Sequence, residues 1–458
     1  MLKFYNLYQD GMVFQQGREI IVCGEGSGEV KVSFLCGSRS ESVSVSAENG
    51  EWRAVISPKG VCKGAVITAE SGGEKAGISD VAVGEVWLIA GQSNMECDIA
   101  YCVGTEEYEE KFGNCDVRFL EMEQEIAFSP LKNRENMKWK KQTAETAQGF
   151  SAIGSIFGYI LGESLGVPIG LVKNYRGGNC IMTFISEQRL RARGEYGECV
   201  SKFEEEKKEL KSAWSMVPCG FYNAMTAPVE PLRFRGVLWY QGESDSAEGR
   251  TFLYPLLLKD LKSQWREMFD DENLLVISVM LPPFSQPPFD YKIVRQIQLE
   301  ADRADDFSEL ISAEDMGARG DDEGWCGIHP KYKTPIAERA ALAALSAVYR
   351  KNGGEWNAPV IKRTERCGSD IKLFFAHAGE GLKAEPKLSG LTVSSDGVDF
   401  HTPESVIGKD FIVIKNCENV RKIRYCYINS ADDGTLGGNL TNETEIPAFP
   451  FEADVSLL

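Results

Sequence analysis

Histidine, long apolar runs and positive charge are all scarce in this chain. Only three of its 458 residues are histidines, and no stretch approaches the ~18 apolar residues that a membrane-spanning helix needs. Lysine and arginine number 50 against 68 aspartates and glutamates, a formal net charge of −18. Such a surface repels phosphate backbones and anionic lipids, so we expect neither nucleic acid nor a membrane as a partner.

The N-terminus and the cysteines indicate the cellular compartment in which the protein is expected to occur. Residues 1–10 contain neither an apolar stretch nor a small-residue cleavage site of the kind that a secretory signal carries. The 13 cysteines are scattered and odd in number, and the tightest pairs lack the spacing of zinc ligands. We therefore expect reduced thiols, a cytoplasmic location, no metal and no cofactor, with a removed secretory leader as the alternative.

Hydrophobic patterning predicts three domains. Residues 1–82 show short apolar runs between Gly/Ser/Asn turns, which is typical of a small β-sandwich. Residues 83–352 alternate continuous apolar runs with helical stretches, the signature of an α/β domain with a mostly parallel sheet. Residues 353–458 return to a β pattern, and no repeat of 20–50 residues indicates a solenoid. The apolar runs of the middle region are Val86–Ala90, Ile169–Val172, Gly236–Tyr240 and Leu274–Val279.

Two helical stretches stand out in the middle region. Residues 186–214 are rich in charge and are interpreted as a solvated helical excursion. Residues 334–349 predict a helix with Thr334 as its N-cap and Pro335 at its first position. One face of that helix is apolar and is expected to pack on the sheet. Its residues are Ile336, Ala340, Ala341, Ala344, Leu345 and Val348.

Ser93 is the first candidate for chemistry, because Gly91–Met95 follows the apolar run that ends at Ala90. Ligands bind at this carboxyl edge of an open α/β sheet. Backbone N–H groups at the start of a following helix could stabilise developing negative charge there. A plain helix N-cap is the alternative interpretation of such a serine.

His329 is the one histidine of the α/β region; the other two lie in the C-terminal β region. A serine nucleophile needs a base whose pKa is near neutrality within hydrogen-bond reach. His329 precedes the helix expected at 334 and is the candidate for that base, against the alternative of an ordinary loop histidine.

Two further strand ends carry polar residues. Trp239–Asp245 places two carboxylates, an amide and a hydroxyl after an apolar run, where they could bind an oxyanion or only orient a loop. Asn174–Asn179 contains two glycines whose backbone N–H groups could face a ligand, although a plain turn is the alternative.

Together these blocks resemble the SGNH-hydrolase superfamily, and within it the sialate O-acetylesterase family of carbohydrate esterases. The resemblance covers nearly the whole chain, and the blocks occur in the family's order. They are Asp10–Gln15, Gly84–Leu88, Gly91–Glu96, Arg176–Asn179, Gly220–Pro228, Tyr240–Asp245, Ile328–Lys331, Asn439–Leu440 and Pro447–Phe451.

The resemblance implies a three-layer, flavodoxin-like SGNH-hydrolase α/β domain with flanking β-sandwich domains. It implies Ser93 as nucleophile and His329 as general base, acting through an acetyl-enzyme. An oxyanion hole would use the Ser93 N–H, the Gly177 or Gly178 N–H and a side chain, for which Gln241 is favoured. Substrate contacts are expected from Arg176, Asn223 and Glu243.

The chain departs from the family pattern at two positions. An aspartate usually lies two or three residues before the histidine, where this chain has Gly327 and Cys326. The acid partner is therefore unassigned. Arg176 replaces the tryptophan of the family's glycine block, and it could either bind an acidic sugar or form a structural ion pair. The acids that could replace the missing one are Asp315, Asp321, Asp322, Glu323 and Glu243.

Several functions therefore compete. The favoured one is removal of O-acetyl groups from sialic acid or a related small acetylated sugar. The alternatives are an esterase for acetylated xylan or manno-oligosaccharides, and a non-catalytic carbohydrate-binding protein on an inactivated esterase scaffold. A general lipase or thioesterase comes third, because no long apolar lid segment is present. Oligomeric state is not predicted.

Overall fold

The computed structural model describes residues 1–209, 216–247, 250–285, 288–317, 327–351, 355–429 and 437–455. The chain forms two compact units. One comprises residues 1–241 with 256–276, and the other comprises residues 242–255 with 277–458. The expected N-terminal β region thus belongs to the same unit as most of the α/β region. The division into three domains stays a prediction.

The N-terminal β region of the first unit contains the expected short strands, arranged in two sets. Strand β3 pairs antiparallel with β1 and β6, and β4 pairs antiparallel with β5 and β7. In β4 and β6, side chains alternate between buried and more exposed, as expected where one face of a sheet meets the core. The strands are β1 (Lys3–Phe4), β2 (Val13–Gln15), β3 (Ile20–Glu25), β4 (Glu29–Cys36), β5 (Arg39–Ser46), β6 (Glu51–Ile56) and β7 (Cys62–Ser71).

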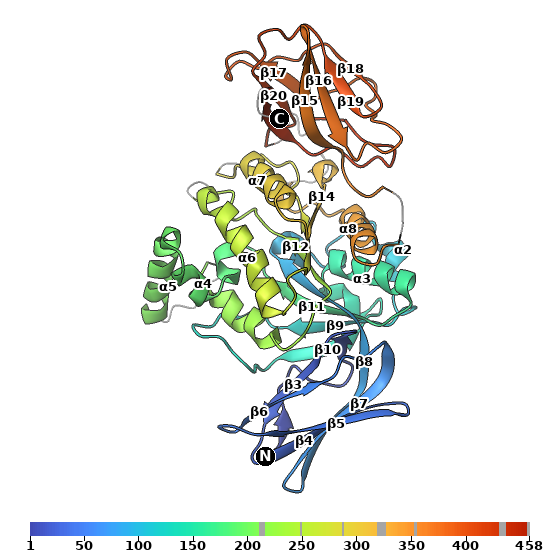
Figure 1. Cartoon of the computed structure of the whole chain (residues 1–458), viewed down its shortest axis with the longest axis vertical. Helices are drawn as coiled ribbons and strands as arrows, with labels where there is room; N and C mark the ends of the chain where they lie inside the picture. Colours follow the sequence, from blue (N-terminus) through green and yellow to red (C-terminus); the bar gives the residue numbers. More distant parts are fainter. Residues whose placement is uncertain are drawn as a thin grey trace. The chain divides into compact units, whose positions relative to one another are not determined.

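Strand β8 (Glu74–Gly91) continues from the N-terminal β region into the α/β sheet (Figure 1). Its first part pairs antiparallel with β7 as far as Val83, and residues 85–91 pair parallel with β11. Every residue from Val81 to Gly91 is buried. The sequence predicted only the apolar run at its end, and the strand begins earlier because β7 supplies a partner for residues 74–83.

The α/β sheet of the first unit has the order β10-β9-β11-β8-β12. Strand β11 is parallel to both β8 and β9, and β12 is parallel to β8, whereas β10 forms an antiparallel edge. The expected apolar runs are confirmed as strands. They are the end of β8, β11 (Ile169–Tyr175), β12 (Gly236–Tyr240) and β13 (Leu275–Val279), which ends in the second unit. Strands β9 (Val117–Met122) and β10 (Met137–Lys141) were not predicted.

Helix α3 (Ala152–Leu165) packs closely on this sheet because the residues at the contact are glycines. Ser151 caps its start by accepting the Gly154 N–H at 3.1 Å. A methyl group at Gly158 would lie 2.7 Å from the Leu171 side chain. The other helices of this unit are α1 (Ser93–Glu96), α2 (Glu106–Glu109), α4 (Glu187–Arg191), α5 (Gly197–Glu209) and most of α6 (Tyr254–Met268).

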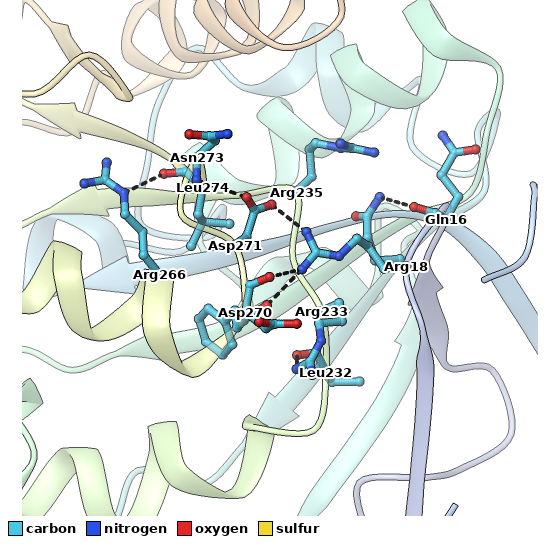
Figure 2. Close-up of polar contacts among 12 residues, drawn as sticks. Gln16, Arg18, Leu232, Arg233, Arg235, Arg266, Asp270, Asp271, Asn273 and Leu274 are labelled. Carbon is cyan, nitrogen blue, oxygen red and sulfur yellow. Dashed lines mark hydrogen bonds and ion pairs between the residues drawn. The ribbon is translucent and has the colours of Figure 1, made fainter. Parts of the chain in front are cut away.

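Polar contacts join the N-terminal β region to the α/β sheet within the first unit. Glu85 is fully buried and accepts hydrogen bonds from Gln16 and from Arg235, the latter at 2.7 Å. Arg18 forms an ion pair of 2.7 Å with Asp271 (Figure 2). Since an unpaired buried carboxylate is costly, these contacts fix how the β region meets the sheet.

The charge-rich stretch 186–214 is helical as expected, through α4 and α5; residues 210–214 lie outside the described part. Arg193 forms an ion pair of 2.6 Å with Asp260, and Arg191 pairs with Glu187 and Glu204. Among the described residues, no helix has the length and apolar character to cross a membrane. Every cysteine in the described ranges is a free thiol.

The second unit contains α7 (Tyr291–Arg303), β14 (Ser308–Ile311) and α8 (Thr334–Ala347). The expected apolar face of α8 is buried except for Val348, which is half-buried beyond the helix end. The expected cap is wrong by one residue, because Lys333 is the N-cap and Thr334 already belongs to the helix. Pro335 fits the second position as well as the first, since neither N–H has an intrahelical acceptor.

The C-terminal β region of the second unit forms two sheets, β15-β16-β19-β18 and β17-β20-β21. Residues of both sheets contribute to one hydrophobic cluster that includes Leu373, Ile412 and Ile423, all fully buried. The strands are β15 (Val360–Cys367), β16 (Asp370–Ala376), β17 (Leu391–Ser394), β18 (Ser405–Ile407), β19 (Phe411–Ile414), β20 (Lys422–Tyr425) and β21 (Phe451–Asp454).

Candidate active site

Ser93 lies just beyond the end of β8, as the sequence predicted. Gly91 makes the turn with a φ of 143°, and a methyl group there would lie 2.1 Å from the Tyr240 carbonyl oxygen of β12. Only glycine fits this conformation and this spacing. The Gln92 N–H donates to the same Tyr240 oxygen at 3.0 Å, so the backbone just before Ser93 is fixed against β12.

Helix α1 is a single turn that begins at Ser93. The N–H groups of Met95 and Glu96 both donate to the Gln92 carbonyl oxygen at 2.9 Å. The N–H groups of these two residues therefore form hydrogen bonds within the turn. The Ser93 N–H, expected in the oxyanion hole, comes before these two in the chain.

The glycine block lies against Ser93. The Arg176 N–H donates to the Gly91 carbonyl oxygen at 3.1 Å. A methyl group placed on Gly177 would lie 3.5 Å from the Ser93 Cβ. Two blocks that are about 80 residues apart in the sequence therefore meet at the carboxyl ends of β8 and β11.

Glu96 links the serine turn to the glycine block. Its Oε2 accepts the Gly177 N–H, and its Oε1 accepts a hydrogen bond from the Gln124 side chain. Gln124 also donates to the Tyr175 carbonyl oxygen at 3.3 Å. Of the two glycine N–H groups that were alternatives for the oxyanion hole, that of Gly177 therefore already donates to Glu96. Gly178 has a φ of 74°, and no acceptor for its N–H lies among the described residues.

Gln241, at the end of β12, also holds the glycine block. Its Nε2 donates to the Asn179 carbonyl oxygen and to the Gln92 Oε1, both at 3.1 Å. An amide has two N–H groups, and both have acceptors here. The Asn179 side chain is 1% exposed, and its Nδ2 has no acceptor within the described ranges.

Arg176 and Asn223 are both buried in the first unit. Burial lowers the pKa of Arg176, while the nearby Glu96 charge opposes that shift. Asn223 lies in a short π-helix, Tyr222–Thr226, a feature that is often found at functional sites. Its Nδ2 donates to the Ala127 carbonyl oxygen at 3.0 Å, whereas its Oδ1 is buried with no donor among the described residues.

His329 and Glu243 belong to the second unit. Burial, with a contribution from the Lys333 charge, lowers the pKa of His329 to about 4, so the imidazole is neutral at pH 7. Glu243 is 1% exposed, and its carbonyl oxygen accepts a hydrogen bond from the Ser246 hydroxyl at 2.7 Å.

Asp315, one of the acids considered as partner of His329, is engaged elsewhere. Asp315 forms a two-pronged ion pair with Arg339, at 2.6 and 2.8 Å, so its carboxylate already has a strong partner. Asp321, Asp322 and Glu323 lie outside the described residues. No group of three or more potential metal-ligating side chains occurs in the part of the chain that the structure describes.

Sequence reasoning missed three residues of this site, namely Glu96, Gln124 and Asn179. Glu96 was within reach, because residues three apart on a helix share a side and Glu96 follows Ser93 at that spacing. Asn179 ends the glycine block, for which the residues alone indicate no more than a turn. Gln124 carried no signal, since its contact with Glu96 depends on the fold.

Comparisons with known proteins identify the family of the chain. A sequence model of the family described as carbohydrate esterase, sialic acid-specific acetylesterase matches residues 83–331, a little over half of the chain. The sialate O-acetylesterases of Pongo abelii and Homo sapiens are each 25% identical over 428 residues, which covers 86% of this chain and 80% of theirs.

A solved structure has the same fold. The carbohydrate acetylesterase XAC1771 from Xanthomonas citri superimposes with a TM-score of 0.86 at 24% identity, over 99% of this chain and 100% of that chain. The chain is therefore an esterase with an α/β fold, and it belongs to the sialic acid-specific acetylesterase family of carbohydrate esterases.

Proposed function

We propose that this protein removes O-acetyl groups from carbohydrates, with sialic acid as the first substrate to consider and acetylated xylo- or manno-oligosaccharides as the alternatives. The observation that carries the proposal is the glycine block held against Ser93 by Gly91, Glu96 and Gln241. Such a fixed set of backbone groups beside a serine is what acyl transfer requires. The expected cytoplasmic location favours small sugars over polymers.

In the proposed mechanism, the Ser93 Oγ attacks the acetyl carbonyl carbon while His329 takes the hydroxyl proton. His329 then gives that proton to the sugar oxygen as the ester bond breaks. Water, deprotonated by His329, attacks the acetyl-serine; His329 returns that proton to the Ser93 Oγ as the acyl bond breaks and acetate leaves. With its pKa lowered to about 4, His329 is unprotonated at neutral pH, but it is a weaker base than the one with a pKa near neutrality that the sequence led us to expect.

We assign the Ser93 and Gly178 N–H groups to the oxyanion hole. The third donor is the side chain of Gln241, as the sequence favoured, or that of Asn179. Gln241 would have to give up one of its two contacts to donate, whereas the Asn179 Nδ2 has none to give up. Loss of one such donor costs about 10²–10³-fold in kcat. Asn179→Ala and Gln241→Ala, compared for kcat, decide between the two.

Arg176 is the residue we assign to the carboxylate of an acidic sugar. The Glu96 charge raises the pKa of Arg176 against the effect of burial, so a structural ion pair with Glu96 is the competing role of Arg176. Arg176→Trp, which restores the usual residue of the family, should lower activity on O-acetylated sialic acid more than on acetylated xylo-oligosaccharides. Equal losses on both substrates would assign Arg176 to the structural role. Asn223 and Glu243 stay predicted substrate contacts.

The test is acetate release from O-acetylated sialic acids, xylo-oligosaccharides and manno-oligosaccharides, with Ser93→Ala measured in parallel. Release that disappears in the variant supports a serine esterase, and the preferred sugar identifies the substrate. If the folded wild-type protein releases no acetate from any sugar, the proposal fails, and the non-catalytic carbohydrate-binding protein becomes the better explanation.

A further inference from the structure

The first unit contains a cavity of about 690 Å³ that takes no part in the proposed chemistry. Strands β5 and β6, the turn between them, and two segments around residues 130–132 and 222–231 line it. None of its lining residues belongs to the serine, glycine or glutamine blocks. The volume is within the range of about 300–1,000 Å³ that is usual for small-molecule sites.

The cavity has rigid apolar walls. Trp52 is 2% exposed and Tyr5 is 7% exposed, so both rings are held by packing. The Trp52 indole N–H donates to the Glu25 carbonyl oxygen at 3.0 Å, and Phe4 contacts the ring edge to face. Tyr222 and Pro231 line the cavity from the α/β side. The rings of Trp52 and Tyr5 are covered, so the apolar surface open to the C–H faces of a ligand comes from exposed Pro130 and half-buried Leu131 and Tyr222.

The charged residues of the cavity already form pairs that a ligand can still reach. Glu51 accepts hydrogen bonds from the Tyr5 hydroxyl at 2.8 Å and from Lys132 at 2.6 Å. Arg53 pairs with Glu230 at 3.3 Å. Side chains of these two ion pairs keep between 42% and 73% of their surface exposed. Glu48 also lines the cavity, so three carboxylates face two cations.

This lining excludes two classes of ligand. An anion would meet an excess of negative charge, on a protein whose net charge is −18. A wholly apolar ligand would take water from the ion pairs and return no hydrogen bonds. A neutral ligand with apolar faces and many hydroxyl groups fits both the walls and the pairs, because each hydroxyl can donate to a carboxylate and accept from a cation.

We propose that this cavity is a binding site for neutral oligosaccharide, separate from the site of ester hydrolysis. The choice of sugar among neutral polyhydroxylated ligands rests on the proposed function; the existence of the site does not. It would hold unmodified neutral sugars of a glycan, or a free oligosaccharide, by ring packing and hydroxyl contacts.

The test is calorimetric titration of the Ser93→Ala protein with xylohexaose, mannohexaose and cellohexaose, none of them acetylated. Ser46→Trp is then added, because Ser46 is an exposed residue at the end of β5 that lines the cavity. Ser44→Trp is the matched control, since it lies two residues earlier on the same face of β5, exposed and outside the cavity. Lys132→Ala removes one exposed donor and serves if Ser46→Trp does not fold.

We expect at least one hexasaccharide to bind, with affinity about tenfold weaker in Ser46→Trp, about fivefold weaker in Lys132→Ala and unchanged in Ser44→Trp. With Ser93 present, Ser46→Trp should hydrolyse p-nitrophenyl acetate like wild type. The proposal is overturned if no neutral hexasaccharide binds, if both tryptophan variants bind equally well, or if N-acetylneuraminate displaces the bound sugar. Because these ligands carry no ester, failure of the esterase function leaves the result intact.

Discussion

At the scale of single residues, Glu96 joins the turn that carries Ser93, the proposed nucleophile, to the glycine block that we assign to the oxyanion hole. It accepts the Gly177 N–H and a hydrogen bond from Gln124, so we expect it to affect the reaction by positioning the glycine block. Small misplacements of reacting groups cost much more in rate than in binding.

Glu96→Ala should therefore lower kcat by about 10–100-fold and leave KM within about twofold of wild type. Steady-state kinetics on a short acetyl ester, together with circular dichroism to check folding, measure the split. A residue with a purely structural role would change the melting temperature without this separation of kcat from KM.

The double variant Glu96→Gln with Gln124→Glu is the control for this prediction. It exchanges the carboxylate and the amide, so the amide now at position 96 can still accept from the Gly177 N–H and can donate to the carboxylate now at position 124. We expect this variant to recover most of the activity that Glu96→Ala loses. Recovery would show that the hydrogen bonds of Glu96 matter rather than its negative charge. Because the carboxylate at position 124 loses the donation to the Tyr175 carbonyl oxygen, Gln124→Glu alone is measured in parallel.

The lowered pKa of His329 predicts an unusual pH profile. A general base works only when it is unprotonated, so activity rises as the pH increases through its pKa. With that pKa at about 4, kcat/KM should already be near its maximum at about pH 5.5. A solvated histidine would instead give half-maximal activity near pH 6.5.

Lys333→Met tests the cause of this shift. The Lys333 charge lowers the pKa of His329, although less than burial does, so its removal should move the acid limb to higher pH. Profiles of kcat/KM from pH 4 to 8 compare the two proteins, with circular dichroism at each pH to exclude acid unfolding. A limb that stays in place would assign the whole effect to burial.

At the scale of elements, two strands end in the same way. Gly91 ends β8 with a φ of 143°, and Gly242 follows β12 with a φ of 144°. Each lets a block of polar residues leave the sheet edge in a direction that an L-residue rarely takes. The sequence indicated the first of these turns from its glycine.

Gly91→Ala should destabilise the first unit by at least about 2 kcal/mol, because its methyl group would meet the Tyr240 backbone and the φ would be strained. Esterase activity should also fall, even under conditions in which the variant is fully folded, since Ser93 would move. Urea denaturation and kinetics measure the two effects. Gly149→Ala is the control, because nothing lies within 4 Å of its added methyl group.

Element positions were predictable where hydrophobic periodicity is strong. The runs at Val86–Ala90 and Gly236–Tyr240 are strands because both of their faces are buried, and a continuous apolar run predicts that. The beginning of β8 at Glu74 was not predictable from its own residues, because its pairing with β7 decides it. The predicted N-cap of α8 was wrong by one residue, because Pro335 fits either the first or the second position of the helix.

At the scale of the whole molecule, the first unit depends on buried polar contacts between its β region and its sheet. Glu85 takes hydrogen bonds from Gln16 on one side and from Arg235 on the other. Arg235→Ala should cost about 3 kcal/mol of unfolding free energy, because it leaves a buried carboxylate without its cation. Chemical denaturation measures this loss.

Lys111→Ala is the comparison for that prediction. Its ion pair with Glu107 is exposed on both sides, so its loss should lower the unfolding free energy much less than Arg235→Ala does. Equal losses in the two variants would show that burial of Glu85 does not matter. A larger loss in Arg235→Ala at all salt concentrations would agree with a buried pair, which salt screens poorly.

The site was predictable as a set of blocks but not as a network. Ser93, Gly178 and Gln241 follow strands, and the carboxyl ends of neighbouring parallel strands must meet. Which N–H donates to which oxygen depends on backbone turns of a few degrees, and no sequence pattern specifies those. The commitment of Gly177 to Glu96 is of this kind.

Strand β8 also limits how the length of this chain can change. One residue inserted between Val81 and Gly91 would turn every later side chain of the strand to the opposite face and shift the serine turn by about 3.3 Å. Insertions are tolerable in the hairpin turns of the β region but not between residues 81 and 91 of β8. The β region can therefore be exchanged between relatives only together with the whole of β8.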